Sequence, residues 1–503
     1  MLAELYNRPV LTGSCSLIIG AILPLAFSPF DYYLVGILSP AILFFFWLGA
    51  TPKQAFTYGY LYGFGMFGTG VNWLHISINL FGGINMAGAL LLTLLLIAFM
   101  ALYPAIVGLI ACRSFINNRK ASFLMLILPA LWTLAEWCRE WVLTGFPWLN
   151  LGSSQIDSPL AGLAPVLGVY GISFAVCLSA GCLINLIITS NRGRIVTLAS
   201  LLILLLTSHY LYQHDWTRLE PESLSVTLIQ GAIPQELKWK PEQRQPTFEL
   251  YLGLSESHWD SDIIVWPETA IPALYHKVKP FIDSLDAVAE LHDMALLTGI
   301  PYKDMDKKKI FNSVLLLGKE EGLYHKHHLV PFGEYLPFDR LLRPFLYFLK
   351  IPMSDFSPDT NKAETLNTKK ASIGVTICYE DAFGKEVIKT LPRATLLLNV
   401  SNDAWFGDSI APHQHLQIAR MRALETGRYL LRATNTGVSA VINEKGKIIA
   451  RSPQFTADAL SADVLTFQGI TPYVITGNWT IVIFCLAIVL LNLYRLQKLK
   501  ARA

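Results

Sequence analysis

Charged residues are scarce in this sequence. They make up 15% of the 503 residues, whereas hydrophobic residues make up 53%, and the mean hydropathy is +0.42. An ordinary soluble protein carries charge on about a quarter of its residues, so this composition excludes that class and indicates an integral membrane protein. With a net charge of only +3, the sequence also lacks the basic excess that is typical of nucleic-acid-binding proteins.

Cysteine is also scarce, and six of the seven cysteines lie in or beside apolar segments, where a thiol packs as a small hydrophobic side chain. These six are Cys15, Cys112, Cys138, Cys177, Cys182 and Cys485. The seventh, Cys378, is the only cysteine between Leu224 and Tyr473, so no disulfide can form within that polar stretch. The β-branched run before it predicts a buried strand that ends at the thiol. Cys378 is therefore a candidate nucleophile, with a buried packing residue as the alternative.

Several apolar segments are each long enough to cross a hydrocarbon core about 30 Å thick. They lie at residues 10–27, 33–50, 55–75, 85–111, 121–138, 160–189, 195–212 and 474–494. No convincing small-residue cleavage site follows the first segment, so we expect it to remain as a membrane helix. The sequence thus predicts an α-helical transmembrane bundle of about eight helices.

Basic residues in the loops predict the orientation of this bundle. If the spans alternate in direction, nearly all lysines and arginines near their ends fall on one side, and Arg139 is almost the only one opposite. The basic side carries Arg8, Lys53, Arg113, Arg119, Lys120, Arg192, Arg194, Arg495, Lys498, Lys500 and Arg502. By the positive-inside rule both termini are cytoplasmic, and the polar stretch after the seventh span is exported. In a bacterium this places the protein in the inner membrane, with the polar stretch in the periplasm.

The predicted division is therefore about seven helices in residues 1–215, an exported domain in residues 220–472, and a last helix with a basic tail in residues 473–503. Short apolar runs in the exported domain predict strands that are buried on both faces. These runs are residues 225–229, 262–266, 296–299, 313–317, 373–377 and 395–400. Helical spacing at Phe281–Leu291 and at His415–Leu431 alternates with them, which predicts a layered α/β sandwich with helices outside.

Four further charged residues stand at predicted strand ends or in nearby loops: Glu268, Lys326, Glu334 and Glu380. Pro267 cannot donate to a sheet, which favours a turn that points Glu268 out of the sheet edge. Lys326 lies in a loop that contains proline and glycine, and Glu380 follows Cys378 by two residues. Each residue taken alone is also compatible with an ordinary solvated side chain.

The motifs around these residues, taken together, resemble those of a known family. Trp266–Glu268, Lys326 with Leu329–Glu334, and Ile377–Glu380 resemble the Glu-Lys-Cys triad of the nitrilase superfamily. Further segments resemble its membrane-bound branch, the apolipoprotein N-acyltransferase family, over nearly the whole chain. These segments are Thr144–Asn150, Ile233–Trp239, Asn399–Gly407, His413–Leu416, Arg420–Glu425 and Arg432–Gly437. The resemblance implies an exported nitrilase-like domain with α-β-β-α layers, attached to the membrane helices.

The resemblance also implies roles for individual residues. Cys378 would be the nucleophile, Glu268 the base that takes its proton, and Lys326 the cation that stabilises the tetrahedral oxyanion. A thiol with a pKa near 8.5 needs such a base or cation at neutral pH. Supporting positions are the carboxylates Glu334 and Glu380, and Tyr379, Trp239 and Asn312, which by the same resemblance would line the acyl or head-group pocket.

The reaction that this family implies is a two-step acyl transfer. A membrane phospholipid, preferably phosphatidylethanolamine, would acylate Cys378 and leave as a lysophospholipid. The α-amine of the diacylglyceryl-modified N-terminal cysteine of an apolipoprotein would then take the acyl chain from the thioester, which completes lipoprotein maturation. No metal, cofactor or nucleic acid is expected.

Two other functions remain open from the sequence. One is a membrane-anchored hydrolase of the same superfamily, in which water replaces the amine. The other is a transporter or receptor whose exported domain only binds ligand. Transport is disfavoured because intramembrane charges should mark a transport path, and the predicted spans carry few charges, chiefly Glu136.

Arg340–Ile351 has basic ends and a dense apolar middle, too short to cross a membrane. Such a segment suits a membrane interface, and we expect a mobile arm that admits acyl chains beside the site. The alternative is an ordinary core helix that is broken at Pro344.

Overall fold

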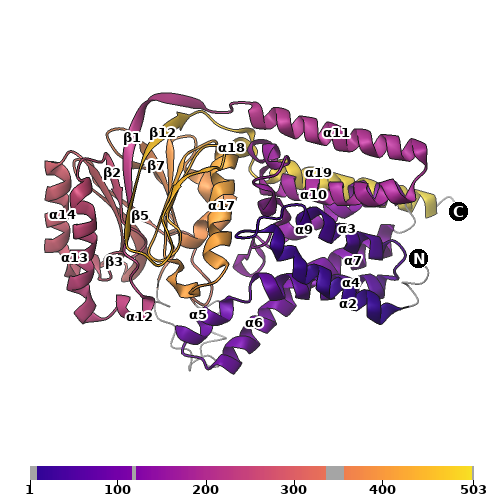
Figure 1. The fold of residues 1–503 in the computed structure, drawn as a ribbon, viewed down its shortest axis with the longest axis horizontal. Coiled ribbons are helices and arrows are strands. Elements are labelled where there is room, and N and C mark those ends of the chain that lie inside the picture. Colours follow the sequence, from indigo (N-terminus) through magenta and orange to yellow (C-terminus); the bar gives the residue numbers. More distant parts are fainter. Residues whose placement is uncertain (1–7, 116–119, 336–355, 501–503) are drawn as a thin grey trace. The chain divides into compact units, whose positions relative to one another are not determined.

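The computed structural model describes residues 8–115, 120–335 and 356–500. The chain forms two compact units (Figure 1). The first contains the residues up to His75, Ala87–Asp215 and the residues from Ile475 onward. The second contains Ile76–Met86 and Trp216–Val474. The predicted arm Arg340–Ile351 lies outside the described residues.

The first unit is helical. Its helices are α2 (Pro9–Ile22), α3 (Val35–Trp47), α4 (Pro52–Gly70), α6 (Met86–Met100), α7 (Leu102–Phe115), α8 (Lys120–Ser122), α9 (Leu128–Cys138), α10 (Ala164–Ile188), α11 (Asn191–Gln213) and α19 (Trp479–Lys500), and α5 (Leu74–Leu80) joins it to the second unit. Within the described residues, five helical segments are long and apolar enough to cross a membrane: Pro9–Ala26, Met86–Ser114, Ala161–Ile188, Asn191–Gln213 and Trp479–Lys498. Val35–Trp47 and Phe123–Cys138 are apolar but shorter. The predicted number of about eight spans thus stays a prediction.

Helices α2 and α4 approach each other closely because glycine lies at their contact. A Cβ atom on Gly65 of α4 would stand 2.1 Å from the carbonyl oxygen of Leu17, and one on Gly20 of α2 would stand 2.0 Å from that of Tyr62. Small residues that let two backbones touch are typical of helices packed in a membrane. This packing accounts for part of the glycine content of α4, whose sequence is otherwise rich in aromatic residues.

The second unit contains two mixed sheets. The first sheet has the order β12-β1-β2-β3-β4-β5, and the second has the order β11-β10-β9-β8-β7-β6. Their strands are β1 (Arg218–Gln230), β2 (Ile263–Val265), β3 (Ala295–Asp304), β4 (Lys309–Leu317), β5 (Gly322–His325), β6 (Leu366–Asn367), β7 (Ser372–Ile377), β8 (Leu396–Ser401), β9 (Leu430–Thr434), β10 (Ala440–Ile442), β11 (Ile448–Arg451) and β12 (Asp458–Gln468). Strands β1, β2 and β3 run parallel, as do β7, β8 and β9.

Helices cover the outer face of each sheet (Figure 1). Side chains of α13 (Arg244–Ser255) and α14 (Lys279–Leu291) share one apolar core with the first sheet. Side chains of α17 (Ala411–Thr426) share another with the second sheet. Shorter helices in this unit are α12 (Gln235–Lys238), α16 (Gly384–Val387) and α18 (Pro472–Thr476). The order of layers is therefore α-β-β-α.

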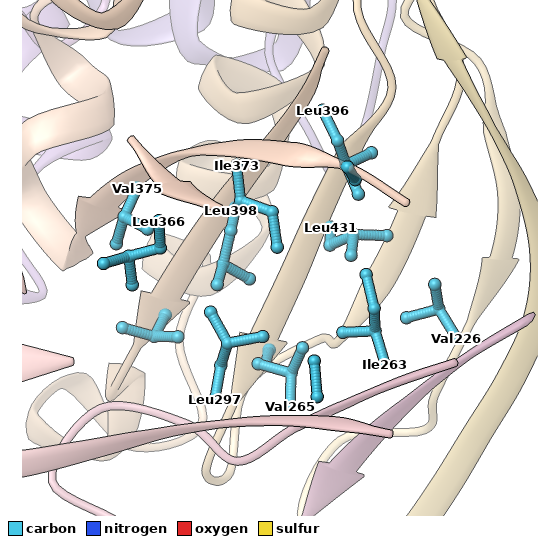
Figure 2. Close-up of a cluster of buried hydrophobic side chains, with 14 of the residues drawn as sticks. Val226, Ile263, Val265, Leu297, Leu366, Ile373, Val375, Leu396, Leu398 and Leu431 are labelled. Atoms are coloured by element: carbon cyan, nitrogen blue, oxygen red, sulfur yellow. The ribbon is translucent and has the colours of Figure 1, made fainter. Parts of the chain in front are cut away.

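The largest core of this unit lies between the two sheets (Figure 2). Ile263 and Val265 of β2 point into it, together with Ile373 and Val375 of β7. The intervening Ile264 points the other way, into the core beneath the outer helices. Both faces of the central strands are thus buried, which explains why their sequences are continuously apolar instead of alternating.

The six predicted strands correspond to β1, β2, β3, β4, β7 and β8, which confirms them, although β2 is one residue shorter at each end than predicted and β8 begins one residue later. The predicted helix His415–Leu431 is wrong at its end. Helix α17 stops at Thr426, and Gly427 follows in the left-handed conformation with φ of 62°. Glycine adopts this conformation without a side-chain clash and commonly ends helices there. Residues Leu430–Thr434 then form β9 beside β8.

Candidate active site

Glu268 and Cys378 lie just beyond the carboxyl ends of two central strands, one in each sheet. Glu268 follows β2 by three residues, and Cys378 follows β7 directly. The backbone turns sharply at both places. Thr269, the residue after Glu268, has φ of 47°, and Cys378 itself has φ of 51°. A residue with a side chain in this left-handed region costs about 1–3 kcal/mol, and such residues cluster at active sites.

A buried polar cluster surrounds the carboxylate of Glu268. Lys326 Nζ lies 2.9 Å from Glu334 Oε1 and 3.9 Å from Glu268 Oε1. Asn312 Nδ2 donates to both carboxylates, at 2.7 Å to Glu268 Oε1 and 3.1 Å to Glu334 Oε1. Lys326 and Asn312 have no exposed surface, and the two glutamates are at most 8% exposed. The fold thus brings four of the predicted site residues together: Asn312 from strand β4, Glu268 from the loop after β2, and Lys326 and Glu334 from the loop after β5.

Burial and charge act in opposite directions on these groups. Burial raises the pKa of Glu268, although Lys326 opposes it. Burial lowers the pKa of Lys326, but Glu334 and Glu268 outweigh that effect, so the pKa lies above its usual value. Burial raises the pKa of the Cys378 thiol, Glu268 adds to the rise, and Lys326 opposes it. Lys326 therefore remains an ammonium, while the thiol stays protonated at neutral pH and needs a base to become a nucleophile.

Glu380 connects the two sheets beside this cluster. Its Oε2 accepts hydrogen bonds from the Ile377 backbone N–H at 2.7 Å and from the Tyr324 hydroxyl at 2.9 Å. Its Oε1 accepts from the backbone N–H groups of His327 and His328, at 2.7 and 3.0 Å. Glu380 therefore ties the residues after Lys326 to the strand end that carries Cys378. We expected Glu380 to support Lys326, and its charge does contribute to the raised pKa of Lys326. Its hydrogen bonds go to three backbone N–H groups and to the Tyr324 hydroxyl.

Comparison with known proteins assigns the family. Residues 19–182 match the family model described as Apolipoprotein N-acyltransferase N-terminal domain, and residues 225–467 match the model described as Carbon-nitrogen hydrolase. The apolipoprotein N-acyltransferase of Methylococcus capsulatus is 43% identical over 93% of both chains. This chain belongs to the apolipoprotein N-acyltransferase family. Proteins of that name from Photobacterium profundum (41% identical, 96% of this chain and 95% of the relative) and Vibrio cholerae (42% identical, 92% of each) are also similar.

The family resemblance predicted from the sequence motifs is thus confirmed. The first matched model covers part of the helical unit, and the second covers most of the two-sheet unit. Among the family positions, Tyr379 is buried, with its ring 5.1 Å from that of Phe383 and 5.9 Å from that of His328. Trp239 directly follows α12 and is 36% exposed. Neither residue is among the polar partners described above for Glu268 and Lys326.

Lys238 is a site residue that the sequence analysis missed. Its Nζ is buried and donates to the backbone carbonyl of Glu268 at 3.0 Å. Burial lowers the pKa of Lys238 to about 8, and Glu268 opposes this shift. No local signal separates Lys238 from the solvated lysines near it in the sequence, because its partner lies 30 residues away.

A second buried network, also missed, lies next to the backbone of Cys378. Four of its side chains form a closed ring of charged groups, which we call the charge ring: Asp381, His415, Asp403 and Arg432. Going around it, His415 Nε2 lies 2.8 Å from Asp381 Oδ1, and His415 Nδ1 lies 2.9 Å from Asp403 Oδ1. Arg432 Nη2 donates to Asp403 Oδ2 at 3.0 Å, and Arg432 Nη1 donates to Asp381 Oδ2 at 3.1 Å. The family motifs contain Asp403, His415 and Arg432, and Asp381 directly follows the motif Ile377–Glu380.

Proposed function

We propose that this protein transfers a fatty acyl chain from a membrane phospholipid to the α-amine of the diacylglyceryl-modified N-terminal cysteine of apolipoproteins, completing lipoprotein maturation. The observation that carries the proposal is the buried cluster of Glu268, Lys326 and Glu334 in a chain of the apolipoprotein N-acyltransferase family. The position of Cys378 at a strained strand end supports its role as the nucleophile. Phosphatidylethanolamine is the proposed donor, on the family resemblance.

In the first half-reaction, Glu268 takes the proton of the Cys378 thiol as the sulfur attacks the ester carbonyl of the phospholipid. The carbonyl oxygen becomes an oxyanion, which the ammonium of Lys326 stabilises. The intermediate collapses with loss of the glycerol oxygen, which takes the proton from Glu268 and leaves as lysophospholipid. The acyl chain remains on Cys378 as a thioester. The raised pKa of Glu268 suits a group that first accepts and then returns a proton.

In the second half-reaction, the α-amine of the lipid-modified cysteine attacks the thioester carbonyl. Glu268 takes a proton from the amine, the C–S bond breaks, and the Cys378 sulfur recovers a proton. The products are an amide and the free enzyme, so no oxidant or cofactor enters the balance. The intermediate divides one ester-to-amide exchange into two easier steps.

Four further residues would support these roles. Glu334 lies 2.9 Å from the Lys326 ammonium, and it keeps that group charged and in place. Asn312 donates to both Glu268 and Glu334 and therefore sets their separation. Tyr379 and Trp239 are proposed to line the acyl or head-group pocket, on the family resemblance alone.

Both substrates are lipids, so we further propose that the protein is a multi-pass protein of the bacterial inner membrane. The proposed arrangement has about eight spans in residues 1–215 and 473–503, both termini in the cytoplasm, and residues 220–472 in the periplasm. Support comes from the apolar helices of the first unit and from the one-sided loop charges. Membrane helices would confine the search for substrate to two dimensions.

Intact-mass measurement on purified enzyme, incubated with phosphatidylethanolamine alone, tests the proposal. We expect one acyl group on a peptide that contains Cys378, absent in Cys378→Ala and retained in Cys138→Ala, which alters another half-buried thiol. The Cys378→Ala protein should remain folded. Full acyl-transfer activity in Cys378→Ala would overturn the mechanism.

The same preparation distinguishes the transferase from a hydrolase. A transferase keeps the acyl group in water and loses it when a diacylglyceryl-modified peptide with a free amine is added. A hydrolase releases the acyl group at the same rate with and without that peptide. The latter result would contradict the proposed function while leaving Cys378 as the nucleophile.

A further inference from the structure

The protonation state of His415 follows from its two partners in the charge ring. Each ring nitrogen lies within 2.9 Å of a carboxylate oxygen, one from Asp381 and one from Asp403. A carboxylate can only accept, so both nitrogens must carry a hydrogen. His415 is therefore an imidazolium, and the charge ring balances two positive groups against two negative ones. All four side chains are at most 3% exposed, so solvent cannot supply the missing partner if one is removed.

The charge ring is connected to the backbone of Cys378 through two donors. His415 Nε2 lies 3.3 Å from the Cys378 carbonyl oxygen, and Asn399 Nδ2 donates to the same oxygen at 3.2 Å. Asn399 is itself held, because its Oδ1 accepts from Arg432 Nη1 at 2.6 Å. Both donors to this carbonyl thus depend on the charge ring. The peptide unit that follows Cys378 is planar, so a fixed carbonyl fixes the whole unit.

We propose that the charge ring is a positioning device for the nucleophile: through His415 and Asn399 it holds the Cys378 carbonyl and so keeps the thiol in its left-handed turn. This inference rests on the proposed function, in which Cys378 attacks the phospholipid. Its members come from different elements that meet behind the turn. Asp381 lies in the turn Cys378–Ala382, Asp403 in Asp403–Phe406, His415 in α17 and Arg432 in β9.

The proposal predicts a specific dependence on pH. Burial and Arg432 lower the pKa of His415, but Asp381 and Asp403 outweigh them and raise it to about 9. Asp381, Asp403 and the carbonyl of Cys378 lie within hydrogen-bonding distance of the imidazole, and the guanidinium of Arg432 acts on it through its charge. Above about pH 9 the imidazole becomes neutral, so one of its nitrogens has no hydrogen and faces a carboxylate oxygen with a lone pair. That contact becomes repulsive, and the hydrogen bond to the Cys378 carbonyl weakens.

The test measures how fast phosphatidylethanolamine acylates Cys378 in a single turnover, by intact mass, at several lipid concentrations. The variants are His415→Gln and the charge-balanced pair His415→Gln with Asp403→Asn, which removes one charge of each sign. The control is His276→Gln, which alters an exposed histidine. At neutral pH we expect both His415 variants to lower the limiting rate by about tenfold to a hundredfold. The lipid concentration for half-saturation should stay unchanged, as should both values in the control.

The pH dependence separates positioning from a merely structural role. The parent-to-variant rate ratio should shrink toward one as the pH rises above about 9, because the parent then loses its imidazolium while the variants have none to lose. A ratio that stays constant with pH, or a His415→Gln rate equal to that of the parent, would overturn the proposal. A double variant that cannot fold would also overturn it, because the charge ring would then serve the fold itself.

A parent protein that takes no acyl group on Cys378 would contradict the proposed function. An acylated parent whose rate is matched by both His415 variants would contradict only the positioning role. The two failures therefore produce different results in one experiment.

Discussion

Replacing Glu380 by glutamine should destabilise the two-sheet unit, although the side chain keeps its shape. The carboxylate accepts four hydrogen bonds, from the backbone N–H groups of Ile377, His327 and His328 and from the hydroxyl of Tyr324. A glutamine offers one accepting oxygen in place of two. If its oxygen keeps the two histidine amides, its NH₂ group faces Ile377 and Tyr324, and only the hydroxyl can rotate to accept.

The size of the loss follows from these contacts. The Ile377 N–H remains buried without its acceptor, which costs about 1–3 kcal/mol. The other three bonds change from charge-assisted to neutral, and charge-assisted bonds are roughly twice as strong. Glutamine recovers part of the lost stability because it buries no charge. Burying the charge of Glu380 is costly, since burial is the main cause that raises the pKa of Glu380. We expect a net loss of about 2–4 kcal/mol in the free energy of unfolding.

Urea unfolding of the purified protein in detergent, followed by tryptophan fluorescence, measures this loss. Glu290→Gln is the matched control, since Glu290 is exposed on α14 and the same exchange there should change stability by less than about 0.5 kcal/mol. Hydrogen exchange adds a local readout, because the Ile377 amide should exchange faster in Glu380→Gln. If Glu380→Gln is as stable as the control variant and Ile377 stays protected, the hydrogen bonds of Glu380 do not hold the sheets together.

Two further predictions concern charge. Glu334→Gln removes the carboxylate that raises the pKa of Lys326 most, so Lys326 should lose its charge at a lower pH. The rate of Cys378 acylation should then decline at a lower pH than in the parent, and an unchanged pH–rate profile contradicts this. The pKa of His415 is raised from 6.5 to about 9, so its contribution to stability is complete below about pH 6.5 and is lost as the pH rises through about 9. The contribution is at most about 3.5 kcal/mol, from about 1.4 kcal/mol per pKa unit. Urea unfolding at both ends of this range checks it, and a pH dependence that persists unchanged in His415→Gln refutes the assignment.

The central strands could be predicted because burial on both faces leaves a continuous apolar run, as in Ile263–Val265. Strand β9 could not be predicted, because Arg432 stands at its centre and arginine is rarely buried without a partner. Its partners Asp381 and Asp403 lie 51 and 29 residues away in the sequence. Lys238 could not be predicted for the same reason, because its partner Glu268 is also distant in the sequence. Local patterns identify residues that bury hydrocarbon, whereas buried charges depend on partners that only the fold brings together.

The environment of Cys378 also bears on how a free thiol survives outside the cytoplasm, where the proposed orientation places it. Oxidation and disulfide exchange proceed through the thiolate. Burial and the carboxylate of Glu268 both raise the pKa of Cys378, so little thiolate exists in the resting enzyme. The same Glu268 is the proposed base, which would remove the proton only as the sulfur attacks a substrate carbonyl beside Lys326. The raised pKa of Cys378 therefore has two effects: it makes the thiol unreactive in the absence of substrate, and it protects the thiol from oxidation.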